Sequence, residues 1–170
     1  MTIMAKSKDK KRKENLSKKE AVTALKFQTE WGFKQLVCNN GGILQMQMEN
    51  ELALIGQLDL CKDLLAIKTF VDAAQRRLQV QPVPDIGDFT KSLVAIALGI
   101  SRVKVLTDDM TFLSWSELVQ KKILSIYYME SIRNSVVEWA KQNGYHTSTY
   151  LGIPIVKFDR IFLLVRYKTK

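Results

Sequence analysis

The stretch that most constrains the fold covers residues 43–80, which contain no proline and a single glycine, Gly56. Its apolar residues alternate spacings of three and four, which is the 3.5-residue period of a coiled-coil seam. The seam positions that we single out for contact with a partner are Ile43, Met46, Asn50, Gln57, Leu60, Leu64, Ile67, Val71 and Leu78. An unbroken helix would be about 57 Å long, so we expect it to project, to bend at Gly56 or to pair with another chain.

Two interpretations of this helix stay open. In an oligomer, the helix would pair along the seam, and Asn50 and Gln57 would set the register or the number of partners. In a monomer, it would form the second half of a helical hairpin over residues 17–80, with both polar residues near solvent.

The start of the chain is strongly basic and is expected to form a separate arm. Residues 6–15 carry no apolar side chain, so residues 1–16 have little to bury and should be disordered. The first helix is expected to begin at Ser17, because Ser17 and Glu20 have the spacing of a capping box. Paired glycines in residues 39–42 should end it, since glycine adopts the left-handed conformation of a helix terminus.

The net charge of +9 comes entirely from the two ends of the chain. Residues 1–20 carry eight Lys or Arg against three acids, residues 157–170 carry five against one, and acids and bases balance between these ends. Such segments contact nucleic-acid phosphates without reading sequence, or they bind an acidic protein surface. The expected contact residues are Lys6, Lys8, Lys10, Lys11, Arg12, Lys13, Lys18, Lys19, Arg166, Lys168 and Lys170. On an extended strand the last three would line one face.

The second half of the chain follows a linker at residues 81–87, where two prolines stop the long helix. The expected elements are a helix from a cap at Asp88 to Gly99, a strand at residues 102–106, a turn at 107–109, and a helix from a capping box at Ser114 to Asn143. The apolar residues of the last helix cover more than half its circumference, which indicates a central position. Its adjacent Tyr127 and Tyr128 would face different directions, so at least one should lie in the core.

The C-terminal segment is rich in β-forming residues and predicts a hairpin of residues 147–157 and 161–168. Pro154 lacks a backbone donor, so the first strand should be an edge strand or carry a bulge. The sequence therefore predicts a predominantly helical α+β domain over residues 17–170. It would combine a long helical hairpin or coiled-coil segment with a small antiparallel sheet that includes the C-terminal β-hairpin, and residues 88–170 would hold the sheet.

The sequence contains little that indicates catalysis, metal binding or membrane insertion. The single histidine, His146, has no local partner of a catalytic site, and Cys38 and Cys61 lack metal-ligand spacing. The longest apolar run, residues 93–100, is too short to cross a bilayer. The N-terminus lacks the apolar core of a secretory signal. We therefore expect no enzyme, no cofactor, no metal and no membrane span, in a protein that is cytoplasmic or assembled into a particle inside a cell.

Three functions are compatible with these features. The first is a non-enzymatic component of a nucleoprotein or virion-like particle, whose Lys-rich arm contacts nucleic acid or an acidic neighbour while the long helix and the C-terminal hairpin dock other subunits. The second is a homo-oligomeric interaction module that uses the seam and binds no nucleic acid. The third is an enzyme with a site that the sequence does not reveal, because catalytic residues need not be neighbours in sequence.

Overall fold

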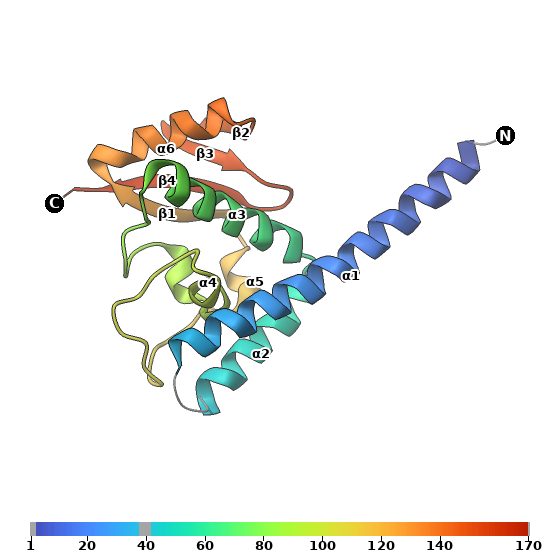
Figure 1. Ribbon diagram of the computed structural model, residues 1–170, viewed down its shortest axis with the longest axis horizontal. Coiled ribbons are helices and arrows are strands. Elements are labelled where there is room, and N and C mark those ends of the chain that lie inside the picture. Colours follow the sequence, from blue (N-terminus) through green and yellow to red (C-terminus); the bar gives the residue numbers. More distant parts are fainter. Residues whose placement is uncertain (1–2, 38–41, 170) are drawn as a thin grey trace.

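The computed structural model describes residues 3–37 and 42–169, with side chains from Ser17 onward. The helices are α1 (Ile3–Leu36), α2 (Gly42–Gln57), α3 (Cys61–Leu78), the 3₁₀ helix η1 (Asp88–Lys91), α4 (Leu93–Leu98), α5 (Trp115–Leu118) and α6 (Glu130–Gln142). The strands are β1 (Ile123–Met129), β2 (His146–Tyr150), β3 (Ile153–Lys157) and β4 (Phe162–Lys168). The described chain combines helices with one four-stranded mixed sheet, which confirms the predicted α+β class (Figure 1).

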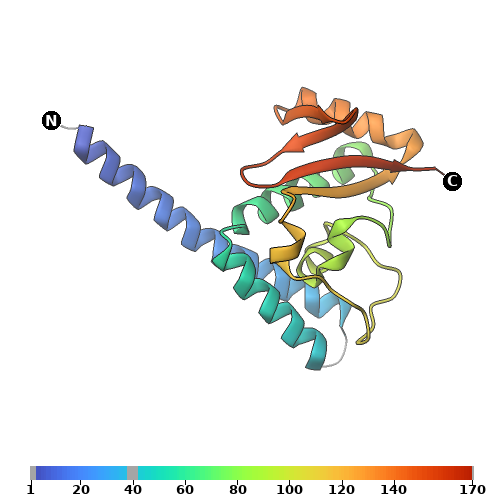
Figure 2. The ribbon, with the colours of Figure 1, turned by 180° about the vertical axis from the view of Figure 1, so that it is seen from behind.

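Helix α1 is the longest element, and its N-terminal half projects away from the rest of the chain (Figures 1 and 2). It begins at Ile3, so the start expected at Ser17 is wrong, and the segment expected as a disordered arm has a helical backbone from Ile3 onward. The C-terminal half of α1 packs against α3 and α4. The helix ends at Leu36, and the stop expected at residues 39–42 lies mostly outside the described residues.

The long helix expected over residues 43–80 is divided into α2 and α3 just after Gly56. Asp59 adopts a left-handed backbone with φ of 58°, and the Leu60 N–H donates to the carbonyl of Ile55 at 3.1 Å. The chain therefore turns, and α2 packs against α4 and α5. Residues 43–80 therefore form neither the single continuous helix nor the simple two-helix hairpin that the sequence predicts.

The coiled-coil seam is divided with the helix. Its second half lies in the core of the chain itself, because Leu60, Leu64, Ile67 and Val71 are all buried and Leu78 is half-buried. Its first half is exposed on α2, at Ile43, Met46, Asn50 and Gln57. In the second half, the apolar period of the seam reflects burial of these residues against other parts of the same chain. The four buried positions are therefore inaccessible to a partner.

Helix α4 lies at the centre of the helical layer and is buried along its whole length. Its last residue is Leu98, and Gly99 stops it with a left-handed φ of 81°, as predicted. Its cap is Ser92, because the carboxylate of the expected cap, Asp88, instead accepts hydrogen bonds from the backbone N–H and hydroxyl of Ser125. The strand expected at residues 102–106 is an irregular loop, whereas the turn after Thr107 is present.

The helix expected from Ser114 to Asn143 is the largest error of the sequence-based prediction. The capping box of Ser114 and Glu117 forms, but its helix, α5, ends at Leu118. Strand β1 follows, with alternate residues buried, and α6 begins only at Glu130. Pairing of β1 with β4 outweighs local helix propensity here, because it buries Leu124 and Ile126 against the strand.

The sheet has the order β1-β4-β3-β2. Strands β1 and β4 are parallel and the other pairs are antiparallel, so the sheet is mixed and not purely antiparallel as expected. The run that contains Pro154 holds two strands, β2 and β3, and β3 is an inner strand. Proline is tolerated there because the pairing of β3 with β4 begins at Ile155, one residue later.

Helix α6 covers one face of the sheet with Val136, Val137 and Ala140. Helix α3 lies on the same side and joins α6 through an aromatic cluster of Phe70, Trp139, Tyr145 and Phe158, whose ring centroids lie 5.1–6.4 Å apart. In Figure 2, β3 and β4 lie in front, with α3 and α6 behind the sheet. Helices α3 and α6 therefore leave the opposite face uncovered, and η1 reaches it only at the edge formed by β1, where Asp88 accepts hydrogen bonds from Ser125.

A buried carboxylate joins α3 to the turn between β3 and β4. Asp63 is 2% exposed, and its Oδ2 accepts hydrogen bonds from the backbone N–H groups of Arg160 and Ile161, both at 2.7 Å. Burial raises the pKa of the Asp63 carboxyl above its ordinary value of 3.8, although the two donors act in the opposite direction. Folding therefore favours the protonated form of this group.

We expect Asp63→Asn to gain stability relative to the wild type as the pH rises. Between pH 3.8 and the raised pKa, the folded wild type binds more protons at Asp63 than the unfolded chain does. The stabilising effect of this protonation is complete below pH 3.8 and is lost as the pH rises through the folded pKa. Urea unfolding of both proteins between about pH 3 and pH 7 measures the difference. A difference that is constant or falls with pH would contradict the assignment, and Asp108→Asn in the exposed turn is the control.

Candidate nucleic-acid interface

The basic residues of the N-terminal segment lie along the projecting part of α1. The backbones of Lys6, Lys8, Lys10, Lys11, Arg12 and Lys13 belong to the helix, while their side chains lie outside the described residues. Lys18 and Lys19 are exposed, and the Lys18 Nζ lies 3.3 Å from the carboxylate of Asp59, which Arg160 also approaches at 3.2 Å. Lys18 therefore forms an ion pair within the chain. Lys19 forms no ion pair with any of the described side chains.

The second group of predicted contacts lies on the open face of the sheet. Residues of β4 alternate between the faces, so Arg166 and Lys168 lie on the face opposite Leu163 and Val165, which are buried. Both cations are exposed, as expected from the sequence. Lys170 lies outside the described residues.

The strand register brings further side chains to this face that the sequence analysis did not select. Tyr127 of β1 is the partner of Arg166, and Met129 is the partner of Lys168. Lys157 of β3 is the partner of both Phe162 on β4 and His146 on β2. These residues come from all four strands, and we call the set of Tyr127, His146, Lys157, Phe162, Arg166 and Lys168 the open-face cluster.

Cations and aromatic rings are adjacent within the open-face cluster. The Arg166 guanidinium carbon lies 5.4 Å from the centroid of the Tyr127 ring, and the Lys157 Nζ lies 5.9 Å from that of Phe162. Tyr127 and Phe162 are half-buried, and Lys157 is exposed. None of the four strands contains an Asp or a Glu. The strands themselves therefore leave the positive charge of this face uncancelled, and Asp88 of η1 brings a carboxylate to its β1 edge, where it accepts a hydrogen bond from the Ser125 hydroxyl.

A hollow of about 720 Å³ opens at the His146 end of the cluster. His146, Lys157 and Phe162 line it, together with Tyr145, Phe158 and one acid, Asp159. His146 is exposed, and His146 is the partner of Lys157 in the β2–β3 ladder. The open-face cluster thus adjoins a hollow at its His146 end.

The sequence carried one usable signal for the missed residues. Phe162 precedes Arg166 by four residues and Lys168 by six on the same strand, so alternation alone places all three on one face. Tyr127 was assigned to a helix, and its position depends on recognising β1. The adjacent Tyr128 is fully buried, which confirms that at least one of the two tyrosines belongs to the core.

The described part of the chain gives no sign of a membrane span or a metal site. None of its helices combines the length and the apolar character needed to cross a bilayer. No three of its His, Cys, Asp and Glu side chains gather as a metal ion would require. No protein-family model matches the chain, and no curated protein matches it.

Proposed function

We propose that this chain is a non-enzymatic, nucleic-acid-binding component of a larger assembly inside a cell, such as a nucleoprotein or a virion-like particle. The observation that carries the proposal is the open-face cluster, where two exposed cations lie beside partly exposed aromatic rings and a third, Lys168, is exposed on the same face. The Lys-rich half of α1 supplies a second basic surface. Contacts to phosphates through both surfaces would hold the strand without reading its sequence.

The composition of the open-face cluster favours single-stranded nucleic acid over a duplex. Unpaired bases stack on aromatic side chains, while lysine and arginine follow the backbone, and this combination binds strands without sequence preference. In a duplex the bases are already stacked on one another, so Tyr127 and Phe162 would contribute little. The projecting helix of α1 has no such restriction, because phosphate contacts by lysine are available on either form.

We expect Tyr127→Ala and Phe162→Ala each to weaken binding of a single-stranded thymidine oligonucleotide of about 20 nucleotides roughly tenfold, because each removes one stacking platform. Duplex binding should change little. Tyr167→Ala is the matched control. Tyr167 lies on β4, like Phe162, but its side chain faces the α6 side of the sheet, where the Arg133 guanidinium carbon lies 4.8 Å from the centroid of the Tyr167 ring. Fluorescence anisotropy of labelled probes measures all four proteins, and far-ultraviolet circular dichroism verifies that each is folded.

A salt series separates the two basic surfaces. Each phosphate contact adds about 0.7–0.9 to the slope of log affinity against log salt, so removing residues 1–16 should lower the slope for both probes. Arg166→Gln with Lys168→Gln should lower it for the single strand. If the full chain binds neither probe at roughly 50 mM salt, the nucleic-acid proposal fails.

A specific observation also favours the homo-oligomeric alternative. Ile43 and Met46 on α2 are 65% and 64% exposed, and these large apolar side chains belong to the accessible half of the predicted seam. A protein that binds neither probe and shows a mass that rises with concentration would support this alternative. An acidic protein surface as the partner of the α1 lysines would give the same null result with the probes but an unchanging mass.

A further inference from the structure

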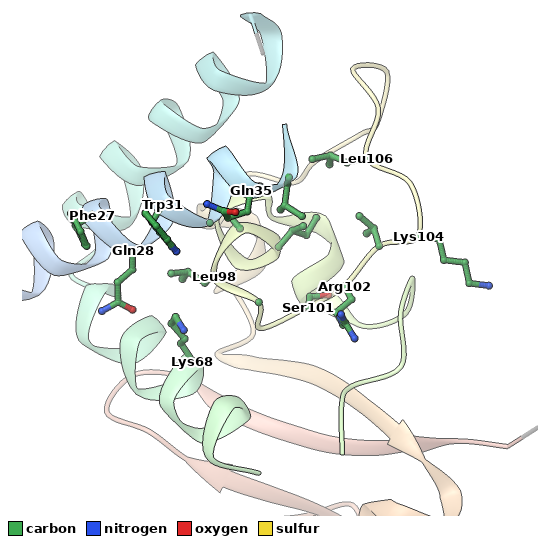
Figure 3. Close-up of a pocket in the computed structure, with 16 residues that line it drawn as sticks. Phe27, Gln28, Trp31, Gln35, Lys68, Leu98, Ser101, Arg102, Lys104 and Leu106 are labelled. Carbon is green, nitrogen blue, oxygen red and sulfur yellow. The ribbon is translucent and has the colours of Figure 1, made fainter. Parts of the chain in front are cut away.

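A second surface, separate from the open-face cluster, is an apolar groove of about 750 Å³ between α1, α4 and the loop at residues 101–106 (Figure 3). Helix α1 contributes Phe27, Trp31 and Leu36 to one wall. Leu98 of α4 lies next to Trp31, and Leu106 of the loop lies on the far side. The groove is lined mostly by carbon, in a region that the nucleic-acid proposal does not use.

The groove exposes two large aromatic side chains one helical turn apart. Phe27 is 69% exposed and Trp31 is 64% exposed. Their spacing of four residues places them on the same side of α1. Tryptophan and other aromatic residues dominate the binding energy of protein interfaces, and contiguous exposed apolar patches mark interaction sites. The pair thus has the character of an interface and not of a surface adapted to water.

The charges around the groove have one sign. Lys68, Arg102 and Lys104 line it, and no Asp or Glu is among its lining residues. Lys68 is paired with Asp72, whereas Arg102 and Lys104 are exposed and have no ion pair recorded among the described side chains. In Figure 3 these two lie on the loop across the groove from α1. An occupant with carboxylates would therefore meet cations without a recorded ion-pair partner on the loop side of the groove.

The walls of the groove are held in place before any partner binds. Gly32 brings α1 into direct contact with the backbone of Ala97 in α4. The loop is fixed by Asp85, whose backbone N–H donates to the carbonyl of Arg102 at 2.8 Å and whose Oδ1 accepts from the N–H of Lys104 at 3.1 Å. A preformed groove avoids the ordering cost of binding, so modest apolar contacts suffice for affinity.

We propose that this groove docks a segment of a partner protein that combines apolar anchor residues with acidic side chains. The apolar side chains of the segment would pack on Phe27, Trp31 and Leu36, which are all exposed, and its carboxylates would meet Arg102 and Lys104. Charge complementarity favours an acidic partner over a second copy of this chain, whose net charge is +9. The aliphatic residues opposite Trp31 favour a peptide over nucleic acid, because they cannot stack on a base.

Selection of binding peptides from a random library tests this proposal, because it assumes nothing about the partner's sequence. A random peptide display library is selected on the immobilised full chain, with counter-selection on Trp31→Ala, and the enriched peptides are measured by fluorescence anisotropy. We expect peptides of net negative charge with aromatic or branched apolar residues. Trp31→Ala should weaken them at least about thirtyfold, which is the size of an interface hot spot. Arg102→Glu with Lys104→Glu should also weaken them, and more strongly at low salt.

The matched control is Met46→Ala, which removes an equally exposed apolar side chain from α2, outside the groove, and should leave peptide binding unchanged. The proposal is overturned if no peptide depends on Trp31, if the enriched peptides are neutral or basic, or if Met46→Ala weakens them as much. It is likewise overturned if sedimentation shows a dimer that Trp31→Ala dissociates, since a second copy would then occupy the groove. Oligonucleotide binding that depends on Trp31 would assign the groove to nucleic acid instead.

Discussion

Replacing Gly32 with alanine is expected to lower the free energy of unfolding by about 3 kcal/mol or more. A β-carbon at this position would lie 1.8 Å from the carbonyl oxygen of Ala97 and 2.8 Å from its carbonyl carbon. These are backbone atoms, so no side-chain rotation relieves the overlap, and α1 must move away from α4. That movement opens the contact through which α1 covers the most buried helix of the chain. Urea unfolding followed by circular dichroism measures the effect.

Gly56→Ala is the matched control for Gly32→Ala. Gly56 also lies in a helix, but an added β-carbon there would meet no heavy atom within 4 Å. Alanine has the higher helix propensity, so this variant is expected to be more stable than the wild type by up to about 1 kcal/mol. Equal losses at both positions would show that α1 and α4 do not approach each other as closely as described.

Replacing Glu51 with alanine is expected to cost about 3 to 5 kcal/mol, because it leaves several buried donors without an acceptor. Glu51 on α2 is 4% exposed. Its carboxylate accepts from the backbone N–H groups of Leu93 and Val94, at 2.9 and 3.3 Å, and from the indole N–H of Trp115 at 3.1 Å. The hydroxyl of Ser92, the cap of α4, donates to it as well. One carboxylate thus joins α2, α4 and α5.

Glu49→Ala tests whether the loss comes from the buried network and not from the removal of an acid on α2. Glu49 is exposed, and its recorded hydrogen bond is to Gln45 within the same helix, so its replacement should change stability by less than about 0.5 kcal/mol. Glu51→Gln should fall between the two, because one carboxamide oxygen remains to accept. A loss in Glu51→Ala no larger than in Glu49→Ala would contradict the described role of the carboxylate.

Glu51 also shows why a buried acid escapes sequence analysis. In the sequence it lies among the residues of a periodic helix, and an acid there reads as part of a solvated face. Apart from Gln47 on the same helix, its donors come from residues 41 to 64 positions away. Nothing local to residues 43–80 indicates that a helix N-terminus and an indole will be brought to this carboxylate. The same holds for Asp63, whose donors lie at Arg160 and Ile161.

For the candidate interface, the sequence placed the charge and the structure placed the aromatic rings. Arg166 and Lys168 were predicted on one face of a strand, and they lie exposed on the open face. Lys157 was not selected, because the sequence does not show which strands lie beside β3 or which of their residues pair with Lys157. Tyr127 was missed because the apolar residues around it fit a helix as well as a strand, and only the parallel pairing with β4 distinguishes the two.

The sequence by itself determined the features that depend on local chemistry. These are the α+β class, the capping box at Ser114, the helix stop at Gly99, and the basic character of the two ends. Tertiary structure decided where the long helix breaks, that β1 is a strand, and which charges and rings share a face. Local preferences, proline apart, differ by at most about 1 kcal/mol per residue, whereas burying one large apolar side chain is worth about 1.5 to 3 kcal/mol. Contacts between distant segments therefore decide wherever the two compete.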